Sequence, residues 1–175
     1  DDSFLRTNTI FEAFENAGAK VAVITAKDKL RKLLGKNLKN AICFSSEKAD
    51  TANMKDNRIE NVLDLVKKPL PEVYSSDLSE FIFAAGVEII KKEKIDIMYL
   101  STTDYIQHKC APGSEIANKF YHMIDGYLKQ LYDLGCEISF TADHGMKGKT
   151  NEDGSLNVIY LQDELDSKFG KDACN

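Results

Sequence analysis

The sequence predicts an α/β fold in which helices flank a mainly parallel sheet, because short apolar runs of strand length alternate with amphipathic segments of helical period. No internal repeat of fixed period is present, which argues against a solenoid or repeat array. A length of 175 residues suffices for one domain with its own core and leaves little for a second. We therefore expect a single α/β domain over residues 1–175.

The first part of the chain alternates helix and strand signals. Within residues 8–17, Ile10, Phe11 and Phe14 lie at helical spacing, and a glycine follows as a stop signal. The β-branched run over residues 20–25 predicts a strand. The elements expected next are a helix over 27–34 closed by Gly35, a strand over 41–44, and a polar, unpatterned loop over 45–58.

The second part repeats the alternation after two prolines. Ser76 can cap a helix that carries Asp77 and Glu80 in its first turn and runs to about Lys92. The elements expected after it are a strand over 95–101, a polar connection, a long amphipathic helix over 114–134, a strand over 136–141, a strand over 158–161 and a short helix from residue 163. A strand, crossover helix and strand in this order are typical of a parallel sheet.

Charge and composition exclude several classes of function. The net charge of −5, with basic residues scattered among acidic ones, argues against nucleic acid as a partner. No apolar run reaches membrane-spanning length, and Asp1 and Asp2 differ from the basic start of a signal peptide. The four cysteines are too widely spaced for a C-x-x-C motif. We expect reduced thiols, no membrane association and a cytoplasmic location, and a homodimer is compatible with the sequence.

Polar residues follow two of the predicted strands at their carboxyl ends. Asp104 lies three residues past the strand that ends near Ser101, and Asp143 with His144 lies two residues past the strand that ends at residue 141. Parallel strands gather ligands at their carboxyl ends, so both groups are expected at one edge of the sheet. Neighbours such as Asp143 and His144 can cooperate only in a turn, which the following glycine favours.

These residue types indicate a metal centre. His108 lies four residues after Asp104, so a carboxylate and an imidazole can converge on one ion, and this pair of ligand types suits Zn²⁺. Two zinc ions need about six protein ligands, whereas Asp104, His108, Asp143 and His144 supply four. A lone Asp–His pair is commonly a helix cap or a surface hydrogen bond, but two pairs at two strand ends favour metal binding. His122 falls within the long helix, away from the expected edge, and is expected on the helix surface or partly buried.

Two lysines lie just past the first strand. Lys27 and Lys29 follow the run over residues 20–25 and, taken alone, are solvated helix residues or an anion-binding pair.

Several stretches together resemble the alkaline phosphatase superfamily and, within it, the phosphonoacetate hydrolases. They are TAKDKLRKLLG near the start, CFSSEKAD, LSTTDYIQHK, NKFYHMIDGYL and FTADHGM. The motif ADHGM alone is similar to several families of the superfamily. The combination of TTDYIQHK with TAKDKLRKLLG favours the phosphonoacetate hydrolases among them. The resemblance spans most of the chain and implies an alkaline-phosphatase-like core.

The resemblance implies hydrolysis of the carbon–phosphorus bond of phosphonoacetate to acetate and phosphate, with two zinc ions and a threonine nucleophile. By similarity, Asp104 and His108 bind one zinc, Asp143 and His144 bind the other, and Lys27 and Lys29 hold the small phosphonate substrate. Zinc would polarise phosphoryl oxygens, and lysines would offset the charge of a trianionic substrate and of the enolate left by cleavage.

The family pattern also includes residues that this sequence does not supply. An amino-terminal aspartate, the nucleophilic threonine and a final histidine ligand cannot be placed in residues 1–175, which agrees with the shortage of ligands. We therefore expect an internal fragment of a longer hydrolase, inactive or nearly so by itself. The alternatives are a phosphodiesterase or nucleotide pyrophosphatase of the same superfamily, which would not need the two lysines, and a non-catalytic α/β metal-binding domain.

Overall fold

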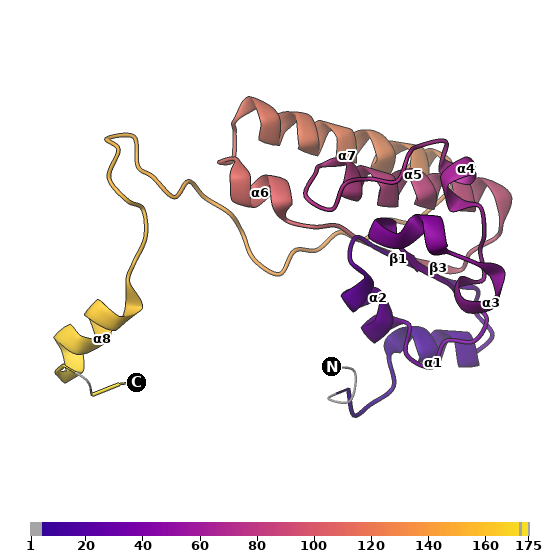
Figure 1. Cartoon of the computed structure of the whole chain (residues 1–175), viewed down its shortest axis with the longest axis horizontal. Helices are drawn as coiled ribbons and strands as arrows, with labels where there is room; N and C mark the ends of the chain where they lie inside the picture. The colour runs from indigo at the N-terminus through magenta and orange to yellow at the C-terminus, as the bar shows by residue number, and fades with distance from the viewer. Residues whose placement is uncertain (1–4, 172, 175) are drawn as a thin grey trace.

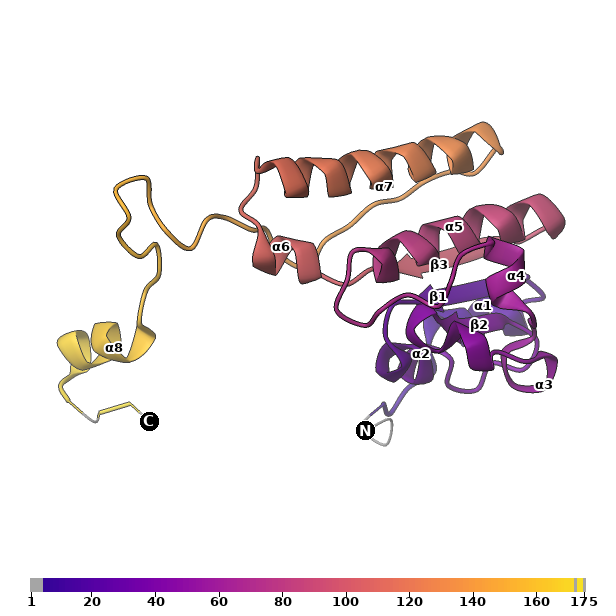
Figure 2. The ribbon, with the colours of Figure 1, turned by 45° about the horizontal axis from the view of Figure 1, so that its top comes forward.

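The computed structural model describes residues 5–171 and 173–174, and its centre is a parallel sheet with the strand order β2-β1-β3. Strand β1 (Val21–Thr25) is wholly buried and pairs on one side with β2 (Ile42–Ser45) and on the other with β3 (Ile97–Ser101). Both pairings are parallel, so the predicted α/β fold with a parallel sheet is confirmed. Strands β1 and β3 are labelled at the centre of the body in Figure 1, and Figure 2 labels β2 beside them.

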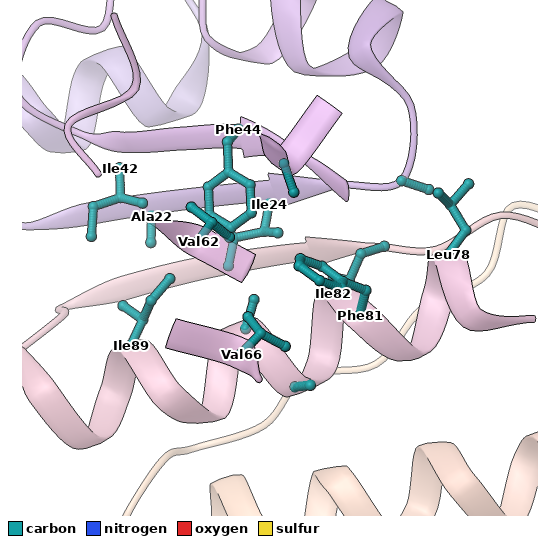
Figure 3. Close-up of a cluster of buried hydrophobic side chains, with 14 residues drawn as sticks. Ala22, Ile24, Ile42, Phe44, Val62, Val66, Leu78, Phe81, Ile82 and Ile89 are labelled. Carbon is teal, nitrogen blue, oxygen red and sulfur yellow. The ribbon is translucent and has the colours of Figure 1, made fainter. Parts of the chain in front are cut away.

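Helices cover both faces of this sheet. Helices α1 (Ile10–Asn16) and α2 (Asp28–Leu34) lie on the face where Phe11 packs against Val21 and Val23. Helix α5 (Asp77–Lys92) covers the other face with α4 (Val62–Val66). Figure 3 shows this second core, in which Phe81 and Ile82 of α5 meet the side chains of β1 and β2. Alternate residues of β1 point to opposite faces, so burial of the whole strand requires helices on both sides.

The predicted crossover helix is present but packs on another helix. Helix α7 (Glu115–Asp133) places Phe120 and Ile124 against Phe83 of α5 and Ile106 of the short helix α6 (Tyr105–Lys109). This arrangement gives a further layer outside α5, as Figure 2 shows. The hydroxyl of Tyr127 on α7 donates a hydrogen bond of 3.0 Å to a Glu80 carboxylate oxygen on α5.

The prediction of an unpatterned loop over residues 45–58 is wrong. The segment contains a 3-10 helix, η2 (Ser46–Thr51), and the single helical turn α3 (Met54–Asn57). The side chain of Asn53 caps α3 by accepting a hydrogen bond of 3.0 Å from the backbone N–H of Asp56. Elements of one or two turns are too short to show a hydrophobic period, and local caps decide them instead. The cap predicted at Ser76 is also absent, since its side chain makes no cap hydrogen bond.

The strands predicted over residues 136–141 and 158–161 are wrong for the structure described. Residues 136–141 belong to no strand or helix, and Phe140 is 72% exposed. Figure 2 shows this segment running back beneath α7. β-propensity alone does not make a strand, because a strand exists only where a neighbour pairs with its backbone.

The described residues that follow form an arm away from the body. A small hairpin closes at the bridge between Thr150 and Leu156, and α8 (Leu161–Phe169) follows it (Figure 1). Ile159 and Tyr160 are 81% and 68% exposed, so the second predicted strand lies in this arm without a partner. Within residues 5–171 and 173–174, the structure has no helix long and apolar enough to cross a membrane.

We expect the contact between Tyr127 and Glu80 to be detectable by titration. Burial, the hydrogen bond to Glu80 and the charge of Glu80 raise the pKa of Tyr127 to about 12. The raised pKa favours the folded state below pH 10, the value for an ordinary tyrosine, and this contribution is lost as the pH rises toward 12. Tyr127→Phe should remove the latest phase of tyrosinate absorbance and cost about 1 kcal/mol in the free energy of unfolding at neutral pH. An unchanged titration would contradict the assignment.

Candidate functional site

The pairing of β1 with β3 aligns their carboxyl ends. Thr25 lies opposite Ser101, and the ladder continues one step further because the N–H of Ala26 donates to the carbonyl of Ser101 at 2.8 Å. Lys27 therefore leaves the sheet beside the segment that leads to Asp104. The strand over residues 136–141, which was expected to bring Asp143 and His144 to the same edge as Asp104, does not form in the described part of the chain.

A one-turn helix positions Asp104 and His108. Asp104 is the residue before α6, and the i to i+4 spacing of a helical turn sets His108 above it. His108 Nε2 lies 2.8 Å from Asp104 Oδ2, so the carboxylate and the imidazole converge as the spacing predicts.

Helix α5 holds the chain just before this pair. The Ser79 hydroxyl accepts a hydrogen bond of 3.1 Å from the N–H of Thr103, and the Thr103 hydroxyl accepts one of 3.0 Å from the N–H of Tyr105. Ser79 is buried, so the loop that carries Asp104 is anchored to the core of the domain.

Asp143 and His144 lie at a bend of the chain. His144 Nδ1 is 3.0 Å from the carbonyl oxygen of Gly145, and its Nε2 is 3.8 Å from Asp143 Oδ2. A hydrogen bond from Nδ1–H to a backbone carbonyl selects the tautomer whose Nε2 carries a free lone pair. That nitrogen is directed to the side of the imidazole on which the Asp143 carboxylate lies.

The two Asp–His pairs interact without forming one cluster. The charge of Asp104 is the smallest of the named contributions that raise the pKa of His144. Among the residues that the structure describes, no group of three or more His, Cys, Asp and Glu side chains could hold a metal ion. Each predicted pair is therefore assembled, but the two pairs are not combined into a larger centre.

Exposure separates these residues from the core. The side chains of Asp104 and His108 are 60% and 52% exposed, and those of Asp143 and His144 are 91% and 56% exposed. Exposed ion pairs of this kind contribute about 0–1 kcal/mol to stability. The stability of the fold therefore depends little on these two pairs.

Lys27 has defined surroundings, whereas Lys29 is exposed. The Lys27 ammonium lies 3.6 Å from Glu47 Oε2, 3.4 Å from the carbonyl oxygen of Val73 and 5.2 Å from the centre of the Tyr74 ring. Asp28, between the two lysines, points inward instead. Its carboxylate is 2.6 Å from Arg31 Nε, and it also contacts Lys32 and Lys48.

Glu47 at this edge is a residue that was not predicted from the sequence. Glu47 lies two residues past β2, the third strand that ends here, and its carboxylate accepts a hydrogen bond of 2.6 Å from the N–H of Asp28. Its position just after a predicted strand could have indicated a place at this edge. It was not considered because residues 45–58 were predicted to be an unpatterned loop. His122 is exposed on α7, outside the site, as expected.

Comparison with solved structures gives a specific match. Two crystal structures of phosphonoacetate hydrolase from Sinorhizobium meliloti 1021, one in complex with phosphonoacetate and one with phosphonoformate, are 58% identical to this chain, with a TM-score of 0.85. The match covers 99% of this chain. The resemblance to phosphonoacetate hydrolase is confirmed. This chain spans 43% of the length of the Sinorhizobium meliloti phosphonoacetate hydrolase chain. No protein-family model matches the sequence.

The surroundings of His144 predict its titration. The hydrogen bond to the Gly145 carbonyl, with a smaller contribution from the charge of Asp143, raises the pKa of His144 above that of an ordinary histidine. Asp143→Asn should therefore lower the pKa of His144 only partly, because the larger cause remains. Proton NMR of the imidazole, assigned with His144→Gln, measures this directly. A pKa at or below the ordinary value in the unsubstituted chain would refute the geometry.

Proposed function

We propose that this chain is part of an enzyme that hydrolyses the carbon–phosphorus bond of phosphonoacetate. The observation that carries the proposal is 58% identity over 99% of the chain to an enzyme crystallised with phosphonoacetate. The arrangement of Lys27, Asp104 and His108 at one edge of the sheet supports it. Because the chain spans 43% of that relative, the activity is proposed for the complete protein.

We propose Asp104, His108, Asp143 and His144 as zinc ligands. Carboxylate oxygen and imidazole nitrogen are ligands that zinc prefers, and Asp104 with His108 presents one of each. The bond between His144 Nδ1 and the Gly145 carbonyl is the usual outer contact of a metal-bound histidine. Two bound zinc ions would polarise the phosphoryl oxygens and lower the pKa of a nucleophile.

Lys27 and Lys29 are proposed to bind the anionic substrate. In the reaction the bond between phosphorus and carbon breaks, phosphorus gains an oxygen and the carbon fragment takes a proton to become acetate. Before that proton arrives, the fragment carries negative charge beside its carboxylate. An ammonium group at that position lowers the energy of this charge. The remaining exposure of the Lys27 side chain, 39%, leaves it accessible to such a ligand.

The assignment of residues 1–175 to one domain of a longer hydrolase remains part of this proposal, as does the threonine nucleophile outside them. A cytoplasmic location is also proposed, and the free state of the four cysteines supports it. The homodimer stays a prediction.

Activity separates this proposal from the alternatives. The complete protein with zinc should release phosphate from phosphonoacetate and act poorly on a nitrophenyl phosphodiester. The 175-residue chain by itself should release little, because loss of a nucleophile costs many orders of magnitude in rate. Preference for the phosphodiester would favour the phosphodiesterase alternative, and rapid release by the isolated chain would contradict the fragment assignment.

Metal content tests the ligands independently of turnover. In the complete protein, Asp104→Ala and His144→Ala should each reduce bound zinc from about two ions to about one, since each removes a ligand from a different ion. The matched control is His122→Ala, which alters an exposed histidine outside the site. Elemental analysis after dialysis gives the stoichiometry. Full zinc content in both ligand variants would refute the assignment.

A further inference from the structure

The start of helix α2 lacks a cap of its own. Lys27 is the residue before the helix, and its side chain makes no cap hydrogen bond. The first N–H groups of a helix need acceptors from elsewhere. The N–H of Asp28 finds one in Glu47 Oε1, at 2.6 Å, so a residue that follows β2 caps the helix that follows β1.

Further hydrogen bonds lock these two strand ends together. The N–H of Glu47 donates to the Ala26 carbonyl at 3.2 Å, and the Ser46 hydroxyl lies 3.3 Å from the same oxygen. The Ser46 hydroxyl also donates to the carbonyl of Leu78 on α5, at 2.9 Å. Ser46 is wholly buried, so this connection is sheltered from water. The backbone on both sides of Lys27 is thereby tied to the core.

The Glu47 carboxylate also faces the Lys27 ammonium. Oε2 is 3.6 Å from Lys27 Nζ while Oε1 holds the next backbone N–H, so one side chain restrains both the backbone and the head group. Thr25 supports the same turn, since its hydroxyl donates to the Lys27 carbonyl at 2.8 Å. With Asp28 held inward by Arg31, the lysines on either side of it are presented outward.

We propose that Glu47 is a positioning residue for phosphonate binding: by capping α2 across the sheet edge, it sets the direction in which Lys27 and Lys29 meet the substrate. This inference rests on the proposed function. The reach of the Glu47 side chain to the Asp28 N–H matters more than its charge, because the capping bond is the shorter contact.

Two conservative variants distinguish the effect of the length of the Glu47 side chain from the effect of its charge. Glu47→Asp keeps the charge but is one methylene too short to cap Asp28, whereas Glu47→Gln keeps an oxygen at the capping distance without the charge. In the zinc-loaded complete protein, E47D should weaken phosphonoacetate binding about tenfold, and E47Q should stay within about threefold of the unsubstituted protein. Because the zinc-loaded protein is proposed to hydrolyse phosphonoacetate, the Michaelis constant from initial rates of phosphate release reports this binding. Glu88→Ala, which removes a half-buried carboxylate paired with Lys91 outside the site, is the matched control.

Amide hydrogen exchange adds a measurement that does not depend on ligand. Exchange at the Asp28 N–H should be faster in E47D and nearly unchanged in E47Q. Faster exchange with unchanged affinity in E47D overturns the positioning role and leaves the proposed function intact. Equal weakening in both variants also overturns it, because charge would then decide. If the unsubstituted protein binds no phosphonoacetate, the proposed function fails and this inference fails with it.

Discussion

Parallel pairing of β1 with both of its neighbours decides where the polar residues of the site can lie. Thr25 lies opposite Ser45 on one side and Ser101 on the other, so three chain segments leave the sheet at one level. A shift of one residue in either pairing would turn that strand's apolar side chains to the wrong face. The cores on both faces therefore maintain the register, and the register places Lys27, Glu47 and the segment to Asp104 along one edge.

Charged residues at this edge fall into two groups with different physical roles. Asp28 is buried, and although burial opposes its ionisation, the hydrogen bond and charge of Arg31, with a further contribution from Lys32, lower the pKa of Asp28. It is ionised at neutral pH as part of the fold. Asp104 and His108 are exposed and have no such structural role in the fold. Asp28 points inward from the start of the helix to pair with Arg31. Lys27 and Lys29, on either side of Asp28, are therefore directed outward.

Features that follow from hydrophobic period or from position after a strand could be predicted from the sequence. Features that depend on a hydrogen-bond partner elsewhere in the chain could not. The runs over 20–25 and 95–101 identified the wholly buried strand β1 and the partly buried strand β3. The spacing of Asp104 and His108 indicated that the two side chains converge, and they lie 2.8 Å apart. The turns η2 and α3 are too short to have a period. The role of Glu47 depends on a hydrogen bond between residues 19 positions apart, which no local pattern encodes. The strands over 136–141 and 158–161 were predicted from β-propensity, but propensity does not determine whether a neighbouring strand is present to pair with them.

The two Asp–His pairs are held by supports of different strength. Asp104 follows β3, whose ladder to β1 is complete, and Ser79 anchors the loop between them. Asp143 follows residues 136–141, which form no strand. Ladder hydrogen bonds are what fix one sheet segment against another, so the position of the second pair depends on an unpaired segment. This difference explains how each pair is formed locally while no group of three metal-binding side chains forms among the described residues.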